Sequence, residues 1–141
     1  MTHARWIPII KYTTSPVRFA NSEESVLTAY RRMQLESVRQ LPVLAAGKLV
    51  GVVFQRDLML AQFLPEKTAD DIPVSRVMST DFYTVGPDAA VDVVAREMCR
   101  HKYGVALVAT NGEVTGVFTT TDALRALSDS LTDSLPESVP E

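Results

Sequence analysis

Hydrophobic residues in the second half of the chain predict the order strand, helix, strand, strand, helix. Residues 82–85 read as a short extended piece that Gly86-Pro87 ends. Apolar positions at 91, 94, 95 and 98 then recur at helical spacing and predict an amphipathic helix over about 88–101. Two apolar runs, 105–109 and 114–119, flank Asn111-Gly112 and predict a tight hairpin, after which Asp122 caps a final helix.

The first half of the chain follows the same order. A helix opens at residues 22–24 and carries apolar side chains at 26, 29, 30 and 33. Apolar runs over 41–45 and 49–54 flank a turn at 46–48, and a closing helix starts at Asp57. One supersecondary unit is therefore used twice.

Direct comparison of the two halves supports this repeat. Residues 7–62 align with 72–127 at a shift of 65 without a gap, and 11 of the 56 pairs are identical, against roughly 4 expected from ordinary composition. A period of this length indicates a compact unit rather than a short motif. The predicted organisation is a lead-in (1–6), repeat 1 (7–62), a linker (63–71), repeat 2 (72–128) and a disordered tail (129–141) that is rich in Ser, Pro and acidic residues.

The Leu41-Pro42-Val43 strand and the two Gly-apolar-apolar-x-x-x-Asp endings, at 51–57 and 116–122, resemble cystathionine-β-synthase (CBS) domains. Two in tandem resemble a CBS pair, or Bateman module, and the resemblance covers about residues 5–128. It implies an α/β (α+β) fold of two pseudo-twofold-related CBS repeats, each with a small sheet packed on helices. It also implies that adenosine-containing ligands bind in clefts between the copies.

Repeat 2 carries the family's complete ligand signature, Gly-apolar-x-Thr/Ser-x-x-Asp, at Gly116-Val117-Phe118-Thr119-Thr120-Thr121-Asp122. The carboxylate of Asp122 can accept hydrogen bonds from both ribose hydroxyls. The Thr119 hydroxyl can donate to a phosphate oxygen, and the N–H groups at a helix N-terminus favour anions. Both side chains also suit helix capping, whether or not a ligand is bound.

Repeat 1 departs from this signature, because Phe54 stands where the hydroxyl belongs, although Asp57 is present. Arg56 could contact a phosphate differently or remain solvated. We therefore expect one competent site at Asp122 and a weak, altered or empty one at Asp57.

The resemblance also assigns the other walls of the binding site. In repeat 2, Tyr103 could stack on adenine or pack half-buried at the helix end. In repeat 1, Arg39 either binds phosphate or is a solvated residue that complements the helix dipole. The remaining candidate ligand-binding residues are Thr84, Val85, Gly104, Val105, Ala106, Val117 and Phe118.

Composition narrows the function classes. The net charge of −3 comes from residues 129–141, because the rest of the chain has 14 basic and 13 acidic residues, which gives no indication of nucleic-acid or membrane-surface binding. With one cysteine, Cys99, and no apolar run of about 20 residues, we expect a soluble cytoplasmic protein. Two histidines, no metal-ligand spacing and no Gly-x-Ser-x-Gly motif predict no catalytic residue, no metal site and no enzyme activity.

The sequence thus predicts a stand-alone regulatory module that senses AMP, ADP or ATP, requires no cofactor, and signals to an effector protein of unknown identity or through a homodimer. Candidate interface residues are Tyr30, Met33, Met59 and Met98, each of which also suits core packing. Two alternatives remain open. The first is an interaction scaffold without nucleotide binding, which is favoured by Phe54 and by Leu107, where the family usually has the proline of Leu-Pro. The second is a sensor of S-adenosylmethionine or a cyclic dinucleotide, which would keep the site and change the ligand.

Overall fold

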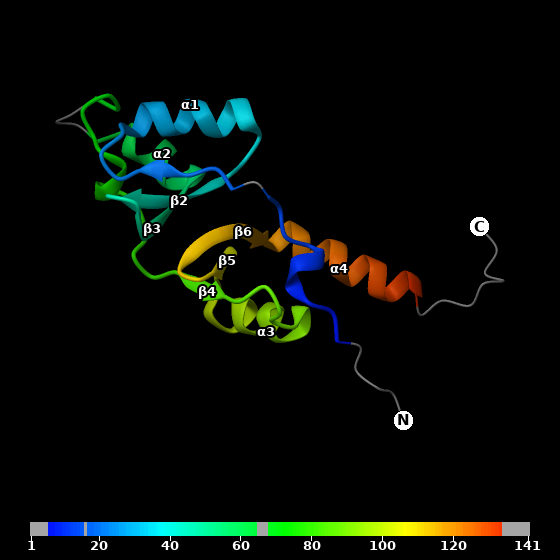
Figure 1. The fold of residues 1–141 in the computed structure, drawn as a ribbon. Coiled ribbons are helices and arrows are strands. Elements are labelled where there is room, and N and C mark those ends of the chain that lie inside the picture. The colour runs from blue at the N-terminus through cyan, green and yellow to red at the C-terminus, as the bar shows by residue number, and fades with distance from the viewer. Residues whose placement is uncertain (1–5, 16, 65–67, 134–141) are drawn as a thin grey trace. The chain divides into compact units, whose positions relative to one another are not determined.

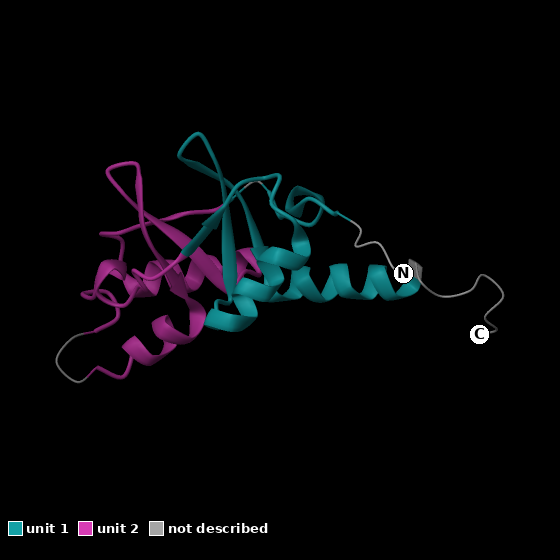
Figure 2. Cartoon of the chain, turned by 90° about the horizontal axis from the view of Figure 1, so that it is seen from below, with its two compact units in different colours: residues 1–17, 83–141 teal, residues 18–82 magenta. Residues whose placement is uncertain are grey.

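The computed structural model describes residues 6–15, 17–64 and 68–133, and it divides the chain into two compact units. Unit 1 combines residues 1–17 with residues 83–141, and unit 2 is residues 18–82 (Figure 2). Among the described residues each unit contains one three-stranded sheet, two α-helices and one short 3-10 helix. The predicted fold of two α/β repeats, each with a small sheet and helices, is confirmed.

Unit 2 begins with a short strand and a helix, followed by a hairpin and a second helix (Figure 1). Strand β1 lies parallel to β2, and β2 lies antiparallel to β3. The elements are β1 (Ala20–Asn21), α1 (Val26–Glu36), β2 (Gln40–Ala45), β3 (Lys48–Phe54), α2 (Gln55–Ala61) and the 3-10 helix η2 (Val74–Arg76).

Unit 1 has the same arrangement, with β4 parallel to β5 and β5 antiparallel to β6. Helix α4 is twice as long as its counterpart α2, with 14 residues against 7. The elements are the 3-10 helix η1 (Ile9–Lys11), β4 (Tyr83–Val85), α3 (Val91–His101), β5 (Val105–Thr110), β6 (Glu113–Thr119) and α4 (Thr120–Asp133).

The lead-in segments of the two repeats are exchanged between the units. The segment with η1 comes from sequence repeat 1 but packs in unit 1, where Ile9 is fully buried beside Val94 and Phe118. Its equivalent with η2 comes from repeat 2 but packs in unit 2, where Ile72 and Val74 are fully buried. The compact units of the fold therefore differ from the sequence repeats 7–62 and 72–128.

Each hairpin turns through two residues with positive φ. Asn111 and Gly112 have φ of 53° and 82°, and Ala46 and Gly47 have 50° and 80°. Two successive positive φ values are the mark of a primed turn, whose twist matches that of the flanking strands. The tight hairpin predicted at Asn111-Gly112 is therefore present, and unit 2 has the same kind of turn at Ala46-Gly47. Positive φ is unfavourable for Ala46 because, unlike glycine, alanine has a β-carbon that clashes with the backbone in this conformation.

Several boundaries differ from the prediction. Helix α1 begins at Val26 rather than at residues 22–24, and α2 begins at Gln55 rather than at Asp57. Helix α3 begins at Val91 rather than about 88, because the N–H of Ala89 closes a turn onto the carbonyl of Gly86 and Ala90 is extended. The predicted disordered tail also began too early, since α4 runs to Asp133 and the Tyr12 hydroxyl donates to Asp129 at 2.6 Å. The remainder of that tail, residues 134–141, lies outside the described residues.

The two long helices differ at their first residue, which leads to a testable difference in stability. Ser25 caps α1 by accepting from the N–H of Thr28 at 3.1 Å, whereas Ala90, its equivalent before α3, offers no side-chain cap. Ala90 already has the extended backbone that an N-cap requires. We expect Ala90→Ser to raise the free energy of unfolding by about 1 kcal/mol. Urea denaturation measures this, and an unchanged or lower midpoint would contradict it.

Candidate functional site

The turn from β6 into α4 holds Thr119 and Asp122 together as a reciprocal helix cap. The Asp122 carboxylate oxygen Oδ2 accepts from the backbone N–H of Thr119 at 2.8 Å and from its hydroxyl at 3.1 Å. In return, the N–H of Asp122 donates to the Thr119 hydroxyl at 3.3 Å. This is the capping-box pattern, with Asp in the position usually held by Glu or Gln. Thr119, not Asp122, is thus the residue that precedes the helix.

The Asp122 carboxylate is buried and has partners on both oxygens. The residue is 4% exposed, and its second oxygen, Oδ1, accepts from Nη2 of Arg125 at 2.6 Å. Arg125 itself is on the surface, with its side chain 58% exposed. A carboxylate has about four acceptor positions, and three are in use. The side chain is therefore fixed in orientation and its charge is neutralised by the neighbouring guanidinium.

Several predicted site residues meet Thr119 at one edge of the unit 1 sheet. Strand β5 starts where β6 ends, so Val105 pairs with Thr119 and Ala106 with Phe118. The Gly104 carbonyl accepts from the N–H and the hydroxyl of Thr120, both at 3.3 Å. The segment from Gly104 to Ala106 therefore lies against the first residues of α4. Val105, Ala106 and Phe118 are buried, so they can offer a ligand backbone groups rather than side chains.

Thr84 and Val85 lie further along the sheet from Thr119 than Val105 and Ala106 do. They pair with Leu107 and Val108, two and three residues along β5 from Val105, a distance of roughly 7 to 10 Å. Thr84 is exposed, whereas Val85 packs against the core. Tyr83, which is not among the residues predicted to bind ligand, pairs with Ala106 and is the β4 residue closest to Thr119 along the sheet.

Tyr103 is engaged by two neighbouring rings. Its ring stacks on Tyr83 with centroids 5.4 Å apart, and His101 lies tilted at 5.5 Å. Burial and, second, the negative charge of Glu97 raise the pKa of the Tyr83 hydroxyl above its ordinary value. Tyr103 also packs against the core of unit 1. The ring is therefore half-buried, and stacking on adenine stays a prediction.

Unit 2 has the equivalent turn without the cap. Phe54 precedes α2 and offers no side-chain hydrogen bond, and Asp57 lies half-buried in the first helical turn. The Arg56 guanidinium lies over the Phe54 ring at 5.2 Å, a cation–π contact. Where unit 1 has a hydroxyl that caps the helix, unit 2 thus has an aromatic ring covered by a guanidinium.

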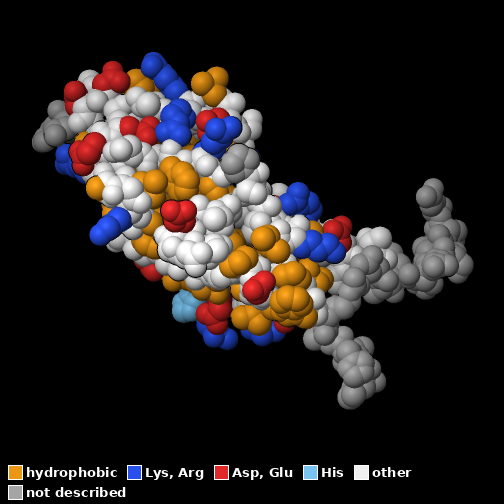
Figure 3. Space-filling model, viewed as in Figure 1, with side chains coloured by type: hydrophobic (Ala, Val, Ile, Leu, Met, Phe, Trp, Pro, Cys, Tyr) orange, Lys and Arg blue, Asp and Glu red, His pale blue; other side chains and the backbone are white. Residues whose placement is uncertain are grey.

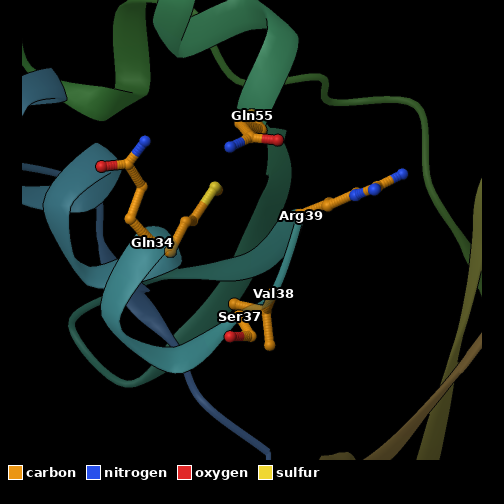
Figure 4. A pocket seen from close by; sticks show the side chains of 6 residues that line it. Gln34, Ser37, Val38, Arg39 and Gln55 are labelled. Atoms are coloured by element: carbon orange, nitrogen blue, oxygen red, sulfur yellow. The ribbon is translucent and has the colours of Figure 1, made fainter.

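Arg39 lies in a pocket of unit 2 of about 410 Å³. Figure 4 shows its side chain extending away from Gln34 and Gln55, the two amide side chains of this pocket. The N–H of Gln55 donates to the Arg39 carbonyl at 2.8 Å, the counterpart of the Thr120–Gly104 contact in unit 1. The other lining residues are Met33, Ser37 and Val38. Asp57 is not among them, so Arg39 and Asp57 do not share this pocket.

Within residues 6–15, 17–64 and 68–133, no three His, Cys, Asp or Glu side chains are grouped so that they could hold a metal ion. In the same part of the chain, every helix is too short or too polar to cross a membrane.

The fold and this site define a tandem α/β repeat protein whose strand-to-helix turns are its candidate binding elements. A family model for the CBS domain matches residues 9–63 and 74–129, most of the chain. The chain belongs to the CBS domain family, and the resemblance noted in the sequence is confirmed.

Solved structures agree in fold. A protein from Vibrio cholerae provisionally assigned to acetoin utilization (AcuB) is 28% identical, has a TM-score of 0.79, and is matched over 94% of this chain and 100% of its own. A CBS domain pair solved with 5′-methylthioadenosine and S-adenosyl-L-methionine is 23% identical with a TM-score of 0.79, covering 89% of this chain and 99% of the other. At 23% identity the second match shows the fold alone.

Curated relatives match over a small part of their own length. Inosine-5′-monophosphate dehydrogenase of Korarchaeum cryptofilum is 33% identical over 101 residues, which is 71% of this chain and 20% of the dehydrogenase. A second curated relative is covered over 13% of its length. The matched region is thus a fraction of each of these larger proteins.

Proposed function

We propose that this chain is a regulatory CBS-pair module that binds an adenosine-containing ligand, namely AMP, ADP or ATP, at the Asp122 site of unit 1. The observation that carries the proposal is the pairing of a threonine hydroxyl with a buried carboxylate at the start of α4, beside the backbone of Gly104. Hydroxyl, carboxylate and helix N-terminal N–H groups together match a ribose phosphate. A CBS domain pair of the same fold has been solved with two adenosine-containing ligands.

The same reasoning makes the Asp57 site of unit 2 the weaker one. Phe54 supplies no donor there, and Arg56 covers its ring. Arg39 remains a proposed anion contact of unit 2, with its side chain extending away from Gln34 and Gln55 of the neighbouring pocket. In this proposal the module catalyses no reaction. A ligand that binds one of two conformations more tightly increases the population of that conformation, and a partner protein recognises the change.

Isothermal titration with AMP, ADP, ATP, S-adenosylmethionine and cyclic di-AMP tests this function. We expect one nucleotide to bind near a 1:1 ratio, and Asp122→Asn to weaken that binding at least about tenfold, since it removes a charged acceptor whose hydrogen bonds are worth about 1.5 to 3 kcal/mol. Asp57→Asn is the matched control at the equivalent position of unit 2 and is expected to leave the main binding event unchanged.

The capping role of Asp122 requires a second readout. Asp122→Asn will weaken the start of α4 by about 1 kcal/mol, so thermal melting of the unliganded variant must show that it remains folded at the titration temperature. The absence of binding heat for every ligand at millimolar concentration would reject nucleotide sensing. Equal weakening by Asp57→Asn would place the site elsewhere.

An interaction scaffold is the competing function, and one observation favours it. Both oxygens of Asp122 already have protein partners, so the residue has a structural role without any ligand.

Selective binding of S-adenosylmethionine or the cyclic dinucleotide in the same titrations would support the third function, a sensor with the same site and another signal.

A homodimer stays part of the proposal, with a revised surface. Met33 and Met98 are buried in the cores, so they are not available to a partner, and Tyr30 is half-buried against the core of unit 2, whereas Met59 is 47% exposed. Its equivalent in unit 1, Leu124, is also exposed, as are Leu127 and Leu131 on the same helix. Exposed apolar residues at this spacing are typical of a helix that packs on another surface.

A further inference from the structure

Arg125 connects the candidate site to the N-terminal segment of unit 1. Its Nη2 atom donates to Asp122 Oδ1 at 2.6 Å and lies 3.4 Å from the carbonyl oxygen of Tyr12. The carboxylate is buried and the guanidinium is largely exposed. Repeat 1 has Leu60 at the equivalent position, so this ion pair distinguishes the intact signature from the altered one.

The ion pair occupies the acceptor that a ribose would need. A ribose diol presents two hydroxyl donors, and a carboxylate that binds both must offer each of them a free position. Oδ2 is filled by the two Thr119 donors, and Oδ1 has one position left beside Arg125. A ribose that binds through both hydroxyls must therefore displace one of these donors. The exposed Arg125 side chain is the one that can swing away from Oδ1, although breaking a charge-assisted hydrogen bond to a buried carboxylate is costly.

A phosphate group removes most of this cost. Guanidinium binds phosphate in the same fork geometry that it uses for carboxylate, so a displaced Arg125 can exchange one anion for another. Its side chain is long and exposed, and Figure 3 shows basic and acidic side chains together on the surface over α4. A ligand with no phosphate offers no such exchange, and a cationic ligand adds repulsion.

We propose that Arg125 is the specificity-determining residue of this site: it selects adenosine ligands that carry a phosphate and disfavours adenosine, 5′-methylthioadenosine and S-adenosylmethionine. This inference rests on the nucleotide-binding function proposed above and assigns the ligand class within it. In the unliganded protein Arg125 blocks the carboxylate, and in the complex it contacts the phosphate.

The test compares two ligands that differ only in the phosphate. Arg125→Leu introduces the residue that repeat 1 carries. AMP then loses the guanidinium that would bind its phosphate, whereas adenosine no longer has to displace Arg125 from Asp122. We expect the ratio of AMP to adenosine affinity, measured by isothermal titration, to fall at least tenfold, with adenosine binding more tightly than to the wild type. Arg125→Lys, which keeps the charge without the fork, is expected to lie between the two.

Arg100→Leu is the matched control, because Arg100 is an equally exposed arginine of unit 1, at 61% against 58%, paired with Glu97. It should leave the ratio unchanged. If Arg125→Leu does not fold, Arg125→Gln provides the same comparison. AMP binding with an unchanged ratio would overturn the role of Arg125 and leave nucleotide sensing intact, as would wild-type binding of adenosine as tight as that of AMP. No binding of either ligand by any form would overturn both.

Discussion

Ile9→Ala is expected to destabilise unit 1 by about 2 to 5 kcal/mol, the cost of truncating a fully buried isoleucine. Ile9 has no exposed surface and packs in the core that contains Val94, Met98 and Phe118. By sequence, Ile9 belongs to repeat 1, whose core residues from Ala20 onward are in unit 2. The substitution therefore tests whether the lead-in segments are exchanged between the units.

The neighbouring residue supplies the control. Ile10 is 58% exposed, so Ile10→Ala should change the free energy of unfolding by no more than about 0.5 kcal/mol. Urea denaturation gives both energies, and hydrogen exchange should show the loss of protection in residues 83–133 rather than 18–64. Loss of protection confined to residues 18–64 would contradict the exchanged arrangement.

Gly51→Ala is expected to cost about 1 to 3 kcal/mol through overpacking. A β-carbon at residue 51 would lie 2.7 Å from the carbonyl oxygen of Ser79 and 2.8 Å from the sulfur of Met78. The Ser79 backbone cannot move away freely, since it exchanges hydrogen bonds with Val52 at 2.8 and 2.9 Å. The glycine that opens the motif is therefore required by the close approach of the η2 segment to β3.

Two further glycines calibrate this effect. Gly116, its equivalent in unit 1, leaves 3.2 Å to the β-carbon of Thr13, so Gly116→Ala should be clearly milder. Nothing lies within 4 Å of a β-carbon at Gly86, so Gly86→Ala should be neutral or raise stability by about 0.4 to 1 kcal/mol. Urea midpoints rank the three variants, and equal costs at Gly51 and Gly86 would refute the steric explanation.

Local signals predicted the elements well. The Asn111-Gly112 pair fixed the hairpin because positive φ is a local property of the backbone, and apolar spacing fixed α1 and α3 because one face of each is buried. Capping by Thr119 and Asp122 was also predictable, since their spacing of three residues is the capping-box spacing. The start of α3 was not, because Pro87 and Asp88 suit a first helical turn and a preceding turn equally well.

The candidate site was less predictable than the fold. Arg125 was missed because an arginine three residues after an aspartate on a helix is usually a solvated ion pair, and only the burial of Asp122 makes this contact important. Tyr83 was missed because its proximity to Thr119 depends on the register of β4 against β5, which no local pattern gives. Met33 and Met98 were considered for an interface because periodicity does not say which apolar face is covered.

The exchange of the lead-in segments also determines which part of this chain can fold when it is moved into another protein. The core of unit 2 draws every one of its buried residues from between Ala20 and Val74. A graft of residues 7–62 would carry Ile9 into a host that lacks its partners and leave behind Ile72 and Val74. To keep the compact unit whole, natural or engineered recombination must therefore break the chain near residues 18 and 82. These points lie inside the sequence repeats rather than at their ends.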